Sequence, residues 1–163
     1  VQIPLLMAMD GMAAGVDTTG NTAVFMMLNL AQHPDKQDIL HREIEDVVGD
    51  DRITSKHIGK MRYLKACLTE SMRLKPTILG TSRITQNPMV LSGYEIPVGT
   101  FVIPMYQMAA TSGEYFSDPH DFKPERWLRD HPDFEKTHAF AHTPFGHGKN
   151  PYMMTYFCFI IDF

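Results

Sequence analysis

A carboxylate and a hydroxyl stand side by side in the long apolar segment that opens the chain, within the stretch AAGVDTTG. Asp17 and Thr18 are suited to passing protons into a buried site. Ala14 and Gly15 leave the helix surface bare on one side, so something flat or bulky could lie against it. The alternative is structural, because small residues allow close helix packing and the Thr18 hydroxyl can bond the carbonyl of Ala14. This stretch alone leaves both interpretations open.

A second pair with chemical meaning lies in ESMR, residues 70–73. A spacing of three places Glu70 and Arg73 on adjacent turns of one helix face, where they can pair. Apolar residues crowd the same segment, so we expect a partly buried pair that needs further partners. Arg126, in FKPERWLRD, is the candidate partner, because its guanidinium fork matches a carboxylate. We expect this network to be architectural rather than catalytic.

A third candidate is the loop PFGHG, residues 144–148. Gly146 and Gly148 let a backbone approach a ligand closely or turn tightly. A lone Gly-x-Gly is equally typical of a plain loop, so the motif gains weight only from its context.

Bulk properties exclude several classes of protein. The chain has 163 residues and a net charge of -4, which gives no support to nucleic-acid binding. Two cysteines, Cys67 and Cys158, are too few for a disulfide framework, and we expect Cys67 to be a small core residue. His138 and His142 have the spacing of a zinc pair, but no HExxH or paired CxxC accompanies them, so we expect no metal site there. The chain opens without an initiator Met or a basic leader, and we expect that its beginning is missing.

The elements that must position these residues are mostly helical. Residues 1–33 predict one long helix beyond Pro4, for which a transmembrane span is the rival interpretation, although Asp10 and Asp17 interrupt it. Pro34 begins a second helix that ends at Gly49, and a third is expected at about 61–74. Residues 82–106 alternate as short strands and hairpins do, and 107–150 are irregular. We therefore expect a mainly α fold with small antiparallel β-sheets.

Taken together and in this order, these motifs resemble the cytochrome P450 family of haem-thiolate monooxygenases. AGVDTT resembles the oxygen-binding motif of its long distal helix, ESMR its ExxR motif, PERW the aromatic-Arg motif of its meander, and PFGHG the opening of its haem loop. The resemblance covers residues 1–150, which would form the C-terminal part of the P450 fold, and is strongest to the mitochondrial branch of insects. Residues 151–163 share nothing with the family.

The resemblance implies haem as the cofactor and assigns roles to particular residues. Asp17 and Thr18 would deliver the protons that dioxygen activation needs, while Ala14 and Gly15 would lie over the haem face. Arg83, in TSRIT, would contact a haem propionate.

The resemblance also assigns the remaining motifs. Phe145 and Gly148 would open the haem loop. Glu70 and Arg73 would pair with Arg126 to support it.

Partners and compartment follow from the same resemblance. The substrate would be an apolar small molecule, with no role for nucleic acid. The redox partner would be a small ferredoxin in a mitochondrion, where Lys65 matches a docking position but Thr69 replaces a second basic residue. The alternative is a flavoprotein reductase at the endoplasmic reticulum membrane.

One departure sits at the centre of the haem loop, which reads F-x-x-G-x-R-x-C-x-G in the family. Aligned from Phe145 and Gly148, the Arg position holds Asn150, the Cys position Tyr152 and the last Gly position Met154. The thiolate both holds the iron and pushes electron density toward it. Tyr152 could ligate as a phenolate, but without the donor strength of sulfur the chemistry would not be the family's.

Cys158 lies six residues beyond the thiolate position and would reach the iron only if the loop bulged; its other interpretation is a free thiol. The abrupt loss of resemblance is typical of a frame shift, intron read-through or damaged gene. Two functions therefore stay open: a fragment of a haem-dependent monooxygenase that lacks its iron ligand, and a non-enzymatic truncated product without haem.

Overall fold

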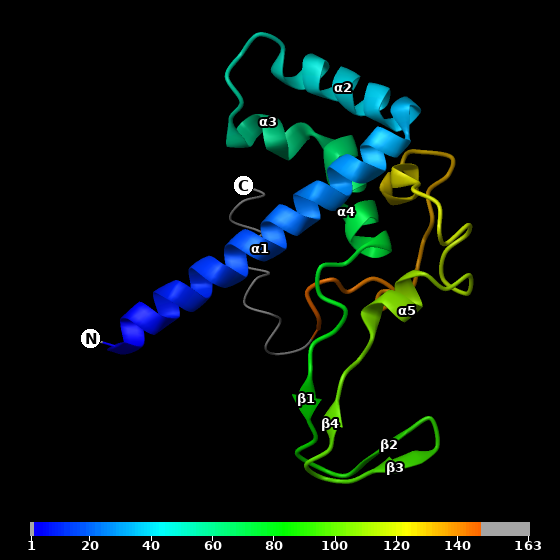
Figure 1. The fold of residues 1–163 in the computed structure, drawn as a ribbon. Coiled ribbons are helices and arrows are strands. Elements are labelled where there is room, and N and C mark those ends of the chain that lie inside the picture. Colours follow the sequence, from blue (N-terminus) through cyan, green and yellow to red (C-terminus); the bar gives the residue numbers. More distant parts are fainter. Residues whose placement is uncertain (1, 148–163) are drawn as a thin grey trace.

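The computed structural model describes residues 2–147, which form a mainly helical chain with two small antiparallel sheets (Figure 1). This confirms the predicted fold class. In order, the elements are α1 (Gln2–Gln32), α2 (Pro34–Val48), α3 (Ser55–Lys60), α4 (Arg62–Leu74), β1 (Arg83–Ile84), β2 (Met89–Leu91), β3 (Tyr94–Ile96), β4 (Phe101–Val102), α5 (Tyr106–Ala110) and the 3-10 helix η1 (Pro124–Trp127).

The long helix α1 sets the scale of the molecule, at about 46 Å for its 31 residues. Its C-terminal half crosses α4, whereas its N-terminal half extends away from the other helices (Figure 1). Much of that half is exposed, including the large apolar side chains of Leu5, Leu6, Met9, Met12 and Val16. Nowhere in residues 2–147 does a helix combine the length and the sustained apolar character that crossing a bilayer would need.

Helix boundaries follow local chemistry in α2 and a tertiary contact in α4. Pro34 begins α2, and Gly49, at a φ of 56°, ends it in the left-handed region that favours glycine. No side chain at Met61 caps α4. Instead the carboxylate of Glu43, on α2, accepts the backbone N–H groups of Tyr63 and Leu64 at 2.6 and 2.9 Å. A negative charge there also complements the helix dipole.

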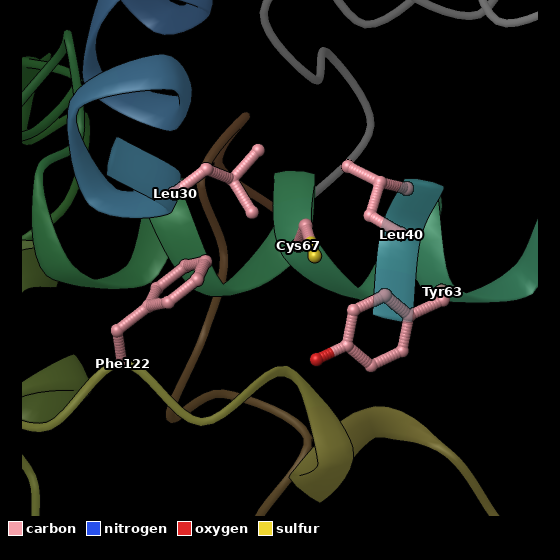
Figure 2. Close-up of a cluster of buried hydrophobic side chains, with 5 residues drawn as sticks. All are labelled: Leu30, Leu40, Tyr63, Cys67 and Phe122. Carbon is pink, nitrogen blue, oxygen red and sulfur yellow. The ribbon is translucent and has the colours of Figure 1, made fainter. Parts of the chain in front are cut away.

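The apolar core lies where α1, α2 and α4 meet the segment that leads into η1. Figure 2 shows its five buried side chains, which converge from these four places: Leu30, Leu40, Tyr63, Cys67 and Phe122. Cys67 is completely buried at its centre, which confirms the prediction that it is a core residue. Burial also raises the pKa of its thiol to about 12, so it is protonated at neutral pH.

The strands form two separate ribbons. β1 pairs with β4, and β2 pairs with β3 with Leu91 opposite Tyr94. Two residues with positive φ, Ser92 at 49° and Gly93 at 87°, close the second ribbon as a tight hairpin turn. The expectation of short hairpins between 82 and 106 is confirmed. The short helices α3 and η1 were not predicted, and α5 begins at the edge of the segment that was expected to be irregular.

At Gly80, the segment after α4 passes the segment before α5 so closely that there is no room for a side chain. A Cβ added there would lie 2.1 Å from the carbonyl oxygen of Pro104. The nearby backbone N–H of Tyr106 donates to the carbonyl of Leu79 at 3.0 Å, so neither strand of backbone can easily withdraw.

We therefore expect Gly80→Ala to lower the free energy of unfolding by about 2 kcal/mol or more, as overpacking does. Urea unfolding followed by circular dichroism measures it. Gly59→Ala is the matched control, because a Cβ there meets nothing within 4 Å and alanine favours the helix α3. Equal stability of the two variants would contradict the close approach at Gly80.

Candidate functional site

A single buried carboxylate gathers three parts of the chain. Glu70 accepts the Arg73 Nε and Nη2 groups at 2.9 and 2.8 Å, and Arg126 Nε at 3.1 Å. It also accepts the backbone N–H of Lys123 at 3.1 Å and the indole N–H of Trp127 at 2.8 Å. Five donors thus surround one side chain that has no exposed surface. The structure brings together the three residues that the sequence placed in one network.

Arg73 uses every N–H group of its guanidinium. Besides Glu70, it donates through Nη1 to the carbonyls of Ala110 and Pro119, both at 2.7 Å, and through Nη2 to the carbonyl of Asp121 at 3.2 Å. Its carbon Cζ lies 4.8 Å from the centroid of the Phe116 ring, which is buried. A fully satisfied planar fork explains why an arginine stands here and a lysine would not serve.

Arg126 carries the network outward toward the surface. Its Nη1 pairs with the carboxylate of Glu135, and its Nη2 donates to the carbonyl of Ser117 at 3.1 Å. With Glu70 and Arg73, two carboxylates balance two guanidinium groups. Burial alone would raise the pKa of Glu135, but hydrogen bonds from Ser117 and the charge of Arg126 outweigh it and hold that pKa below its usual value.

A neighbouring carboxylate ties α2 and α4 to η1. Glu125 accepts Lys36 Nζ at 2.9 Å and the hydroxyl of Tyr63 at 2.8 Å. Burial opposes its ionisation, but these donors keep its pKa below the usual value. Burial first, and then Glu125, raises the pKa of Tyr63. Two adjacent residues of PERW therefore anchor in two different ion clusters.

His142 is adjacent to the network through its contact with Trp127. Its ring packs on Trp127, with 5.2 Å between centroids, and its Nε2 is buried without a hydrogen bond among the described residues. Burial lowers the pKa of His142 to about 4; Glu70 acts in the opposite direction and Arg73 reinforces the shift. The imidazole is therefore neutral at physiological pH.

On α1 the predicted acid and alcohol occupy different surroundings. Asp17 is exposed, whereas Thr18 is half-buried and its hydroxyl donates to the carbonyl of Ala14 at 2.7 Å. This is the local bond expected under the structural alternative. A Cβ added at Gly15 would meet nothing within 4 Å, so the surface beside Ala14 is open.

The remaining predicted residues lie in β1 and in the segment that follows His142. Arg83, in β1, is exposed and donates to the carbonyl of Ser82 at 2.9 Å. Phe145 is half-buried. Gly146 has a φ of 80°, which favours glycine, and a Cβ there would make a tight contact of 3.3 Å with the hydroxyl of Tyr106. Gly148 falls outside the described residues.

The described residues offer no iron ligand of the expected kind. Cys67 is protonated and enclosed in the core. In residues 2–147, no group of three or more His, Cys, Asp or Glu side chains has an arrangement that could hold a metal ion. Asn150, Tyr152, Met154 and Cys158 all lie outside the described residues.

Several residues that complete the site could not be selected in advance. Trp127, Glu135 and the backbone of Lys123 become partners of the network only once residues 111–135 fold back over α4. His142 carried one signal, its place three residues before Phe145, but nothing in the sequence indicates that its ring meets Trp127.

Comparison with known proteins gives this arrangement a family. A family model described as Cytochrome P450 matches residues 6–150. The chain is 40% identical over 137 residues to the rat protein named "1,25-dihydroxyvitamin D(3) 24-hydroxylase, mitochondrial", covering 83% of this chain and 26% of that protein. It is 37% identical over 158 residues to "Probable cytochrome P450 12a5, mitochondrial" of Drosophila melanogaster, covering 90% of this chain and 30% of the relative. The chain thus spans less than a third of the length of these relatives.

The buried network predicts a large difference between two conservative substitutions on α4. Arg73→Lys breaks a buried, fully bonded ion pair and should lower the free energy of unfolding by about 3–5 kcal/mol. Arg62→Lys is the matched control, because Arg62 is exposed and its pair with Asp130 faces solvent. Denaturant midpoints measure both. Arg73→Lys with the stability of Arg62→Lys would contradict the structural role of the network.

The environment of His142 predicts a loss of stability in mild acid. The pKa of His142 is about 4 in the folded chain and 6.5 for an unperturbed histidine, so folding favours the neutral form. This stability is complete above pH 6.5 and is lost as the pH falls toward 4. His142→Phe should flatten that part of the stability profile, whereas His41→Phe, at an exposed site on α2, should not. The same slope in both variants would contradict the burial of His142.

Proposed function

Because the chain belongs to the cytochrome P450 family, we propose that it is the C-terminal part of a haem-dependent monooxygenase that inserts one atom of dioxygen into an apolar small molecule. The observation that carries the proposal is the Glu70, Arg73 and Arg126 network, closed by Trp127. These residues match the family's ExxR and meander motifs, and the network holds Lys123 and η1 against α4.

Among the described residues, some could pack against the faces of a haem, but none is a suitable axial ligand for its iron. The open surface at Ala14 and Gly15 can accept a flat ring, and Arg83 and Phe145 are the proposed contacts at its edge. In members of the family, bound haem activates dioxygen. The sequence nevertheless places Tyr152 where the thiolate belongs, and Cys67 cannot replace it. In this chain the donor set does not fit a thiolate-ligated haem.

The proposed roles on α1 concern protons. Asp17 is exposed to solvent and is the proposed entry point for protons, and Thr18 passes them toward the face formed by Ala14 and Gly15. The Thr18 hydroxyl proton is engaged by the Ala14 carbonyl, so the hydroxyl must rotate away from it to donate elsewhere.

Partners and compartment are proposed from the relatives. Two of them carry the word mitochondrial in their names, which supports a mitochondrial location and a ferredoxin as electron donor, with exposed Lys65 as a contact. Nothing in these names supports the alternative at the endoplasmic reticulum.

We further propose that residues 1–150 are one partial P450 domain and that a change in the coding sequence has replaced the family's residues from position 150 onward. The competing function is a non-enzymatic product without haem. The exposed apolar side chains of α1 favour this alternative, because a chain that leaves such surface uncovered is prone to aggregate.

Haem reconstitution distinguishes the two functions. We expect the chain as it stands to incorporate little haem and to show no absorbance band typical of thiolate-ligated haem when reduced under CO. The triple variant Asn150→Arg, Tyr152→Cys, Met154→Gly restores the loop and should gain that band. A thiolate band in the unaltered chain would contradict the loss of the ligand. No haem in either protein would favour the non-enzymatic product.

A further inference from the structure

A chain of hydroxyl groups joins α1 to the segment after α4. Thr22 Oγ1 lies 2.9 Å from Thr77 Oγ1 and 2.8 Å from the carbonyl oxygen of Thr18. A hydroxyl has one proton, and Thr22 uses its proton on the carbonyl. Thr77 is therefore the donor to Thr22, and the chain runs from Thr77 through Thr22 to the backbone of Thr18.

This stretch of α1 contains residues that weaken a helix. Gly15 and Gly20 each cost about 1 kcal/mol relative to alanine. Two successive side-chain bonds to the carbonyl four residues earlier, from Thr18 and from Thr22, compete with the backbone ladder and bend helices. The acid and alcohol at 17 and 18 therefore lie in a turn whose orientation the helix itself fixes poorly.

Among the described residues, the hydrogen bonds that join α1 to other segments come from one stripe of the helix. Asn29 donates to Ser71 Oγ at 2.7 Å in a buried contact, seven residues beyond Thr22 and on the same face of the helix. Among the described residues, the bond between Thr22 and Thr77 is the hydrogen bond from α1 to another element that lies nearest to Asp17. N-terminal to it, from Pro4 to Val16, the residues whose burial is described are exposed, with Gly15 the one exception.

We propose that Thr22 and Thr77 are positioning residues for the turn that carries Asp17 and Thr18. By holding the Thr18 carbonyl, the two hydroxyls set the orientation of this turn relative to α4, the helix that bears the buried Glu70 network. The inference rests on the proposed function in one respect only, namely that this turn delivers protons.

Amide hydrogen exchange of the full chain, resolved by peptide, tests the proposal without haem. Thr77→Val keeps the shape and removes the donor. It should speed exchange of amides 15–22 about five-fold, the factor that corresponds to one ordinary hydrogen bond. Thr77→Ser keeps the hydroxyl and should restore slow exchange.

Ser71→Ala is the matched control, because it also removes a hydrogen bond to α1 but farther from Asp17. It should speed exchange near Asn29 and leave amides 15–22 within about two-fold of the parent. Unchanged exchange at 15–22 in Thr77→Val, failure of Thr77→Ser to restore it, or equal loosening of 15–22 in Ser71→Ala would each overturn the proposal. None of these exchange measurements depends on haem binding. The positioning role can therefore be tested even if the proposed function is wrong, and its failure would not contradict the proposed function.

Discussion

The carboxylate of Glu70 is the interaction on which the rest of the structure depends. It accepts donors from its own helix, from the backbone before η1 and from two side chains of η1. A buried charge is tolerated only when its hydrogen bonds are complete, and here each donor belongs to a segment that must be in place. Arg73 extends the same constraint to the carbonyls of Ala110 and Pro119. The irregular chain between α5 and the loop at Gly146 is therefore ordered by polar contacts with α4 as well as by the burial of Phe116 and Phe122.

The residues that support the fold differ from those that the family's chemistry requires. The network, the core beside Cys67 and the turn at Gly146 support a family architecture. The chemistry requires a sulfur donor that the sequence does not place at position 152. The proposed loss of the iron ligand would therefore leave this framework in place while removing the donor on which the family's chemistry depends.

The sequence predicted what depends on spacing within one element, and from charge and fork geometry it also predicted Arg126 as a partner of Glu70. It missed the other contacts that depend on the path between elements. The pairing of Glu70 with Arg73 follows from their separation of three on a helix, and the hairpin near Gly93 follows from alternation and turn residues. By contrast, the cap of α4 comes from Glu43 on another helix, so nothing beside Met61 signals it. Trp127 reaches Glu70 across 57 positions of sequence. Such partners are fixed by the folded path of the chain, which no local pattern specifies.

The most direct measurement is to sequence the genomic DNA and the transcript across the codons from Phe145 onward. If the chain is a monooxygenase segment altered in its coding sequence, a neighbouring frame or a splice junction will encode Arg, Cys and Gly in place of Asn150, Tyr152 and Met154. If both DNA and transcript confirm Tyr152 and the present residues after it, with no frame that restores the cysteine, the monooxygenase function is contradicted and the non-enzymatic product is the better description.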